Sequence, residues 1–201
     1  MRTRTLLNPF SCFQRFNKQN WHEVFPNFTG KLDVEIGCGN GAFLINYALK
    51  NKHRNLVGFE IKERLVAFIK QKIAVEQLNN AHVFWGNGQI GLEDIFEDAS
   101  IDRIFIFHPD PWPKTAHQKR RLVNQELLTL VQRKLKSNGQ LYLSTDVPEL
   151  WDYMITTVEN SQLFVRDEDE EFWATLYQTR WHEMSQLKQK QLSYATYKVI
   201  K

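Results

Sequence analysis

The sequence predicts an α/β domain built on a doubly wound, mostly parallel sheet with helices on both faces. From Lys31 onward, short apolar runs typical of strands alternate with longer stretches in which apolar residues recur at helical spacing. One run, residues 101–107, ends in four consecutive apolar residues, which is typical of a strand buried on both faces. The first run leads directly into a turn with three glycines in five residues. Strands that alternate with helices in this way form βαβ units and therefore a mostly parallel sheet.

The predicted domain follows an N-terminal arm, residues 1–30, which has scattered aromatic and basic side chains. Residues 31–201 form a single domain, because a chain of this length suits one hydrophobic core. In its first half we expect strands at 32–36, 55–61 and 82–85, and helices at 42–50, 63–78 and around 92–96. The helix at 63–78 has its apolar residues at helical spacing, namely Leu65, Phe68, Ile69 and Ile73.

The second half begins with the strand at 101–107 and continues with a helix at 120–135, which we expect Asn138-Gly139 to end. A strand follows at 140–145. Pro148 then begins another helix, since proline is tolerated in a first helical turn. The last strands are expected at 163–166 and 193–200, which makes seven strands in all.

The charge of the chain is mildly basic and unevenly distributed. The net charge is +3 and the sequence pI is near 8.8, which alone does not establish a nucleic-acid partner. Between residues 114 and 136, however, seven Lys or Arg residues accompany one Glu, whereas residues 167–171 are all acidic. The positions of the charged residues along the chain are therefore more informative than the net charge.

The cysteines and the distribution of apolar residues indicate the cellular compartment of the protein. Cys12 and Cys38 offer no metal-ligand spacing, so we expect no metal, and two isolated cysteines fit a reducing compartment. No apolar run approaches membrane-spanning length, and the first residues lack the apolar core of a signal peptide. We expect a soluble, cytoplasmic protein with no membrane partner.

Gly37, Gly39 and Gly41 form a Gly-x-Gly-x-Gly turn between the first strand and the first helix. Glycines here let the backbone turn tightly and approach a ligand closely. The spacing differs from the Gly-x-Gly-x-x-Gly of dinucleotide sites, and no Lys-Ser/Thr follows as in a phosphate-binding loop. Taken alone, the turn leaves open a tight connection that binds nothing.

Two acidic residues near this turn indicate its ligand. Glu60 lies near the end of the second strand, where an acid accepts hydrogen bonds from ribose hydroxyls. Glu35 lies within the first strand, where a buried carboxylate is costly unless a cation or hydrogen bonds compensate. The amino group of S-adenosylmethionine would supply that cation, whereas a dinucleotide brings phosphates that Glu35 would repel. Asn87 is placed to meet the adenine edge, although Asn87-Gly88 also suits a simple turn.

The loop after residues 101–107 holds the strongest functional signal. Pro109 and Pro111 enclose Asp110, and Trp112 follows. The prolines stop the strand and stiffen the loop at a strand's carboxyl end, where ligands bind in open α/β sheets. Amino-directed methyltransferases place Asp or Asn, prolines and an aromatic residue here, so we expect this loop to grip a nitrogen-bearing planar ring. The alternative is that Asp110 only caps the next helix.

Five basic side chains follow the loop directly: Lys114, His117, Lys119, Arg120 and Arg121. Such a run is commonly a solvated helix face. Beside a candidate active site it also suits a shelf for phosphates, that is, a basic surface that binds the phosphates of a nucleic acid and sets its affinity and orientation. Asp146 closes the strand at 140–145 on the same edge of the sheet. His108 could titrate, but a strand-end histidine beside aromatic residues is more often packed than catalytic.

These motifs together resemble the bacterial tRNA (guanine-N7)-methyltransferases. That family carries Glu-Ile-Gly-x-Gly-x-Gly, then Phe-x-Asp-Pro-Trp-x-Lys-x-x-His-x-Lys-Arg-Arg-Leu, then Thr-Asp, and late in the chain Thr-x-Phe/Tyr-Glu. The corresponding segments here are 35–41, 108–122, 145–146 and 179–183, and the resemblance extends from about residue 30 to the end. It implies a Rossmann-like class I methyltransferase fold whose last strand is antiparallel. It also implies methyl transfer from S-adenosylmethionine to N7 of the guanine at position 46 in the tRNA variable loop, with S-adenosylhomocysteine as the second product.

The resemblance further implies roles for single residues. The cofactor-contacting positions of the family correspond to Glu35, Glu60, Asn87 and Asp110, and Asp110 is also its proposed catalytic residue. Its substrate contacts correspond to Lys114, Asp146 and Thr179. This chain departs from the family pattern at Asn87, where many members have Asp, and at His108, where most have an aromatic residue. It also departs at His182, where the family has Glu. Glu183 follows one position on, and the sequence leaves open which of the two replaces that Glu.

Two other functions stay open on the sequence. One is an S-adenosylmethionine-dependent N-methyltransferase that acts on a protein or small molecule. The other is a non-catalytic RNA-binding relative that kept the fold, which the altered segment at 179–183 makes conceivable. The sequence also leaves open whether the protein is a monomer or a homodimer, which tRNAs are its substrates, and what the N-terminal arm does.

Overall fold

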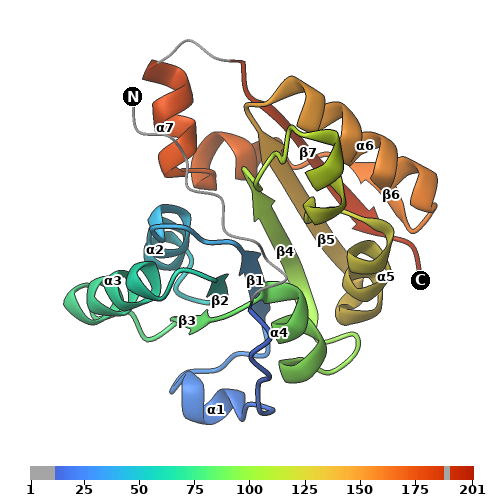
Figure 1. Ribbon diagram of the computed structural model, residues 1–201. Coiled ribbons are helices and arrows are strands. Elements are labelled where there is room, and N and C mark those ends of the chain that lie inside the picture. The colour runs from blue at the N-terminus through green and yellow to red at the C-terminus, as the bar shows by residue number, and fades with distance from the viewer. Residues whose placement is uncertain (1–11, 188–190) are drawn as a thin grey trace.

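A computed structural model describes residues 12–187 and 191–201 and contains a seven-stranded sheet (Figure 1). The strands are β1 (Leu32–Ile36), β2 (Asn55–Glu60), β3 (Ala81–Trp85), β4 (Ile101–Phe107), β5 (Leu135–Thr145), β6 (Phe164–Asp167) and β7 (Ser193–Val199). Their order is β3-β2-β1-β4-β5-β7-β6, and β1 to β5 pair in parallel. β7 is antiparallel to both of its neighbours. The predicted doubly wound sheet with an antiparallel last strand is therefore confirmed.

Helices cover both faces of this sheet. α4 (Gly88–Ile95), α5 (Gln125–Lys134) and α6 (Pro148–Ser161) pack on one face. α2 (Ala42–Lys50), α3 (Glu63–Val75) and the π-helical turn η3 (Phe172–Leu176) pack on the other. The remaining helices are α1 (Trp21–Val24), the 3₁₀ helix η2 (Thr115–Arg120) and α7 (Arg180–Leu187). No helix in the described part of the chain is long and apolar enough to cross a membrane.

The apolar end of β4 is buried on both faces of the sheet, as expected for a central strand. Ile104 and Ile106 belong to the core cluster on the α4–α5–α6 face. Phe105 and Phe107 point the other way, into the cluster formed with α2, α3 and η3. Side chains alternate across a strand, so a run that is apolar at every position needs cover on both sides.

The structure corrects the prediction for residues 120–145. The expected helix at 120–135 begins only at Gln125, because the Asn124 side chain caps it and accepts a hydrogen bond from Leu127 N (2.9 Å). Thr115–Arg120 form a separate 3₁₀ helix. β5 already begins at Leu135, so Asn138-Gly139 lies within the strand and does not end a helix. The pairing of β5 with β4 shifts register between Ile101 and Arg103, which accommodates the extra residues as an irregularity in the strand.

Two further helix boundaries also differ from the expectation. α4 begins at Gly88, earlier than expected, because Asn87 caps it, and α3 ends at Val75. The described part of the predicted N-terminal arm, residues 12–30, packs against the domain. There Phe25 is fully buried in the core cluster, and Phe16 packs edge-on against Phe59.

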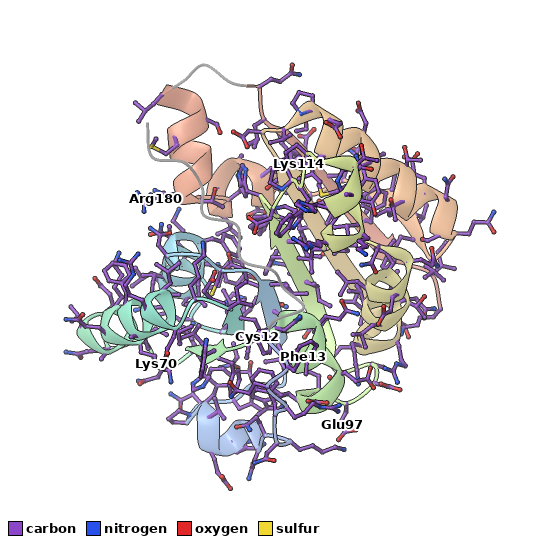
Figure 2. The ribbon with its side chains drawn as sticks, in the orientation of Figure 1. Cys12, Phe13, Lys70, Glu97, Lys114 and Arg180 are labelled. Carbon is purple, nitrogen blue, oxygen red and sulfur yellow. The ribbon has the colours of Figure 1, made fainter. Side chains whose placement is uncertain are left out.

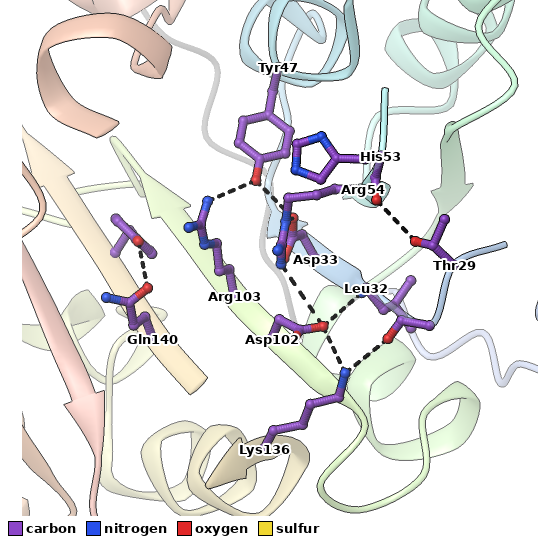
Figure 3. Close-up of polar contacts among 12 residues, drawn as sticks. Thr29, Leu32, Asp33, Tyr47, His53, Arg54, Asp102, Arg103, Lys136 and Gln140 are labelled. Atoms are coloured by element: carbon purple, nitrogen blue, oxygen red, sulfur yellow. Dashed lines mark hydrogen bonds and ion pairs between the residues drawn. The ribbon is translucent and has the colours of Figure 1, made fainter. Parts of the chain in front are cut away.

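The amino-terminal edge of the sheet is fixed by a polar network (Figure 3). The buried Asp33 carboxylate accepts hydrogen bonds from Arg54 Nε (2.6 Å) and Nη2 (2.5 Å) and from the Tyr47 hydroxyl (2.8 Å). Asp102 accepts from Leu32 N and from Lys136 Nζ, both at 2.9 Å. Charge pairing of this kind compensates for burying Asp33 and leaves the opposite, carboxyl-terminal edge for a ligand site.

Candidate active site

The candidate site lies at the carboxyl-terminal ends of β1 to β5. β1 pairs with β2 on one side and with β4 on the other, so the chain reverses its direction of winding between β1 and β4. In open α/β sheets a crevice forms at such a switch point, outside the ends of the strands. The glycine turn follows β1 and the Asp110 loop follows β4, which brings the two strongest sequence motifs to this point.

The glycine turn has a backbone that few other residues adopt. Gly37, Gly39 and Gly41 have φ angles of +81°, +57° and +73°. A Cβ atom on Gly37 or Gly39 would meet nothing within 4 Å, so these two residues border open space. A Cβ atom on Gly41 would instead lie 2.7 Å from Ile69 Cγ1. The first two glycines therefore leave room for a ligand, and the third lets α2 pack against α3.

Glu60 closes the side of the turn nearest β2. Its Oε2 accepts a hydrogen bond from Gly39 N and its Oε1 one from Lys62 N, both at 2.9 Å. A carboxylate oxygen has a second lone pair, so both oxygens keep capacity for a hydroxyl donor. Burial raises the pKa of Glu60, these hydrogen bonds lower it, and the negative charge of Asp110 raises it again. Glu60 ends β2 and Asp110 follows β4, so both carboxylates belong to the carboxyl-terminal edge of the sheet.

Glu35 is the most unusual group of the site. Its side chain is 97% buried, and its Oε2 has no hydrogen-bond partner among the described residues. Burial, together with the charge of Glu60, raises the pKa of Glu35 to about 8. A buried carboxyl oxygen without a partner is costly, so the arrangement suits a cationic ligand group. An amino group on a ligand would supply such a cation.

Asn87 has a role in the fold as well as a place in the site. It caps α4, and its Oδ1 accepts a hydrogen bond from Gln89 N (2.9 Å). This is the turn function that the sequence left open beside adenine contact. Asn87 also borders a hollow of about 450 Å³ between α4, α5 and residues 12–15, where Cys12 and Phe13 lie (Figure 2). Of the predicted site residues, Asn87 alone lines this hollow.

Asp110 lies on a loop that other contacts hold in place. His108 and Trp112, two residues before and after it, have φ angles of +47° and +42°. Such conformations cost about 1–3 kcal/mol each in non-glycine residues, so the surroundings must impose them. The helices that follow begin at other caps, Lys114 for η2 and Asn124 for α5. Asp110 therefore caps neither of them, and the capping alternative is wrong.

Trp112 braces this loop from within. Its side chain is buried, with the Arg120 guanidinium 5.1 Å from the ring centre and the His117 ring edge-on at 5.8 Å. A ring covered in this way packs the loop and offers little free face for stacking on a base. The structure therefore favours Trp112 as a brace of the loop over Trp112 as a stacking surface for a base.

The basic segment divides into exposed and buried members. Lys114 and Lys119 are exposed, and Lys114 lies near the carboxyl-terminal end of β4 (Figure 2). Arg121 is 5% exposed, and it donates to Pro111 O and pairs with Glu149. The expected shelf of five basic side chains is therefore not continuous, because Arg121 points into the fold.

A buried polar cluster that the sequence did not reveal lies beneath the loop. The Tyr177 hydroxyl is 2.8 Å from both His108 Nε2 and Ser144 Oγ. His108 Nδ1 lies 3.5 Å from Asp146 Oδ1, and Ser185 Oγ donates to Asp146 Oδ2 (3.0 Å). Burial raises the pKa of Tyr177 to about 12. His108 is thus packed, as its position predicts.

This cluster brings the late segment of the chain to the site. Thr179 is buried and contacts Tyr177 by a side-chain hydrogen bond, which places it beside the ends of β4 and β5. The side chains of His182 and Glu183, at the departure from the family motif, lie outside the described part of the structure. Among the described residues, no group of three or more His, Cys, Asp or Glu side chains could hold a metal ion.

The chain is similar in sequence to known methyltransferases. A family model described as "Putative methyltransferase" matches residues 29–198. The tRNA (guanine-N(7)-)-methyltransferase of Streptococcus sanguinis strain SK36 is 34% identical over 152 residues, 76% of this chain and 68% of that protein. The enzyme of the same name from Prochlorococcus marinus strain MIT 9515 is 35% identical over 154 residues, 75% of this chain and 74% of that protein.

Solved structures share the fold at low identity. The 16S rRNA methyltransferase KamB superposes with a TM-score of 0.66 at 13% identity, over 94% of this chain and 96% of that one. The aminoglycoside resistance methyltransferase NpmB1 gives a TM-score of 0.59 at 15% identity, over 90% and 92%. At this identity the likeness supports the architecture alone.

Proposed function

The chain belongs to the tRNA (guanine-N7)-methyltransferase family, and from this premise we propose that it methylates N7 of the guanine at position 46 in the tRNA variable loop. S-adenosylmethionine is the methyl donor and S-adenosylhomocysteine the second product. The observation that carries the proposal is the buried, unpartnered Oε2 of Glu35 at the mouth of the glycine turn. This oxygen suits a cationic ligand group, and the Asp110 loop follows β4 at the same edge of the sheet.

Different residues of the crevice would bind different parts of the cofactor. When bound, S-adenosylmethionine supplies an electrophilic methyl group on a sulfonium. Glu35 would hold the amino group of the methionine part, and Glu60 would accept hydrogen bonds from the ribose hydroxyls. Gly37 and Gly39, which border open space, let the backbone lie close to the ligand. Asn87 would meet the adenine edge at the end of β3.

Asp110 would orient the guanine. N7 of guanine has an in-plane lone pair and no proton, so attack needs no general base. The main task of the site is then to align N7 with the methyl group, and alignment of reacting atoms lowers a barrier by several kcal/mol or more. N7-methylation leaves a positive charge on the ring, and the Asp110 carboxylate would stabilise it.

The tRNA would be held by the side chains around this loop. Exposed Lys114 and the neighbouring His117 and Arg120 would contact phosphates, which sets affinity and orientation. Asp146 directly follows β5, and Thr179 directly precedes α7. Both side chains would contact the substrate. Since the substrate is tRNA, we place the enzyme in the cytoplasm.

Methyl transfer to defined tRNAs tests the proposal. The purified protein is incubated with methyl-labelled S-adenosylmethionine and an unmodified tRNA transcript, and the methylated base is mapped. A matched transcript carries adenine in place of guanine 46. We expect label on the first transcript at guanine 46 and none on the second. Equal label on both transcripts, label on protein, or no transfer despite cofactor binding would contradict the proposal.

A further inference from the structure

Arg121 lies at the end of the basic segment but is engaged on every side within the fold. Its Nε donates a hydrogen bond to the Pro111 carbonyl (3.1 Å). Its Nη2 donates to Glu149 Oε1 (2.7 Å). Its guanidinium lies 4.6 Å from the centre of the Tyr153 ring. The side chain is 4% exposed, so it is poorly placed to reach a phosphate of a bound nucleic acid.

These contacts join two parts of the candidate site that are far apart in sequence. Pro111 directly follows Asp110. Glu149 and Tyr153 belong to the first turns of α6, which begins two residues after Asp146. The planar guanidinium therefore connects the loop that carries Asp110 with the helix that begins just after Asp146. A planar group with several fixed donors can make both contacts and stack at once, which a lysine ammonium cannot.

We propose that Arg121 is a positioning residue, which fixes the Asp110 loop relative to α6 and thereby sets the placement of Asp110 against the substrate base. The proposal rests on the proposed methyltransferase function. The loop needs such support because His108 and Trp112 hold left-handed conformations on either side of Asp110. Trp112 has its own brace in Arg120 and His117, while the Pro111 carbonyl depends on Arg121.

Loss of this brace should change turnover more than binding. Small displacements of a catalytic group, of the order of 1 Å, can reduce rates by about a hundredfold. In Arg121→Met we expect kcat for tRNA methylation to fall at least about tenfold, while KM for tRNA and the dissociation constant for S-adenosylhomocysteine stay within about threefold. Arg121→Lys keeps the charge but cannot join both partners, so it should not restore kcat.

Lys119→Met is the matched control from the exposed part of the same segment. If Lys119 contacts phosphate, this variant should raise KM for tRNA and leave kcat nearly unchanged, the opposite of the result for Arg121. Glu149→Gln removes the charge of one partner and leaves the Pro111 contact, so it should lower kcat by a smaller factor than Arg121→Met.

The outcomes separate the two proposals. No methylation by the unaltered protein would overturn the proposed function itself. Normal kcat in Arg121→Met, full rescue by Arg121→Lys, or a rise in KM for tRNA at constant kcat would overturn the positioning role while the function stands. If thermal unfolding shows that Arg121→Met does not fold, Glu149→Gln decides. A lower kcat at unchanged KM then supports the role, and unchanged kinetics overturn it.

Discussion

Ionisation of Glu35 should control cofactor affinity near neutral pH. Its pKa of about 8 means that the carboxyl group is mostly protonated at pH 7 in the ligand-free protein. A cationic amino group binds the ionised form, so binding must release a proton, and affinity must rise with pH. Each pH unit below this pKa costs about 1.4 kcal/mol, or about a tenfold loss of affinity. Between about pH 6 and 7.5 the dissociation constant should therefore fall by about an order of magnitude or more.

Isothermal titration with S-adenosylhomocysteine, which carries the same amino group, measures this directly. Titrations at pH 7 in buffers of different ionisation enthalpy should show release of nearly one proton per ligand bound. Glu35→Gln should bind more weakly at pH 7.5 and show neither the pH dependence nor the proton release. A flat pH profile in the unaltered protein, or an unchanged profile in Glu35→Gln, would refute the assignment of Glu35 to the amino group.

The same group predicts how stability depends on pH. The pKa of Glu35 is raised in the folded protein from an ordinary value of 4.5, so the folded state holds this proton more tightly than the unfolded state. The stability that this proton contributes is complete below about pH 4.5 and is lost as the pH rises through about 8. Glu35→Gln lacks this loss. In the absence of ligand it should therefore melt at a higher temperature than the unaltered protein at pH 8, although it binds the cofactor less well.

Three further predictions concern the loop, the basic segment and the glycine turn. Asp110→Ala should lower kcat for methylation by about a hundredfold while S-adenosylhomocysteine affinity changes only modestly, and equal turnover in a single-turnover assay would rule out its role. Lys114→Ala should weaken tRNA binding at all sequences and reduce the slope of log affinity against log salt by about 1, measured by filter binding over a salt series; an unchanged slope would place Lys114 away from phosphates. Gly41→Ala should destabilise the protein by about 2–4 kcal/mol, because strain at φ +73° adds to a 2.7 Å approach to Ile69. Gly30→Ala, at φ +77° with nothing within 4 Å, is the control for strain alone and should cost about 1–2 kcal/mol in chemical denaturation.

Features that depend on local pattern could be predicted from the sequence. The apolar run of β4 needs cover on both faces wherever it lies, and the glycines at 37–41 impose a tight turn in any fold. The burial of Glu35 followed from its place inside a strand. These arguments fixed the sheet type and the edge on which the candidate site lies.

Features that depend on tertiary packing could not be predicted. Arg121 stands in a run of basic residues, and nothing local separates a buried brace from an exposed phosphate ligand. The difference comes from Glu149 and Tyr153, which are about thirty residues away on α6. Tyr177 likewise enters the site only because the chain returns from η3 to the ends of β4 and β5. The prediction of a single helix at 120–135 was wrong at 120–124 because Asn124, a strong helix cap, starts α5 only at Gln125.

A crystal structure of the protein with bound S-adenosylhomocysteine tests the central claim most directly. The account predicts the amino nitrogen within hydrogen-bond distance of the Glu35 carboxyl group, the ribose hydroxyls at Glu60, and the sulfur facing the Asp110 loop. A ligand bound in the hollow between α4 and α5, or one whose amino group lies away from Glu35, would contradict it.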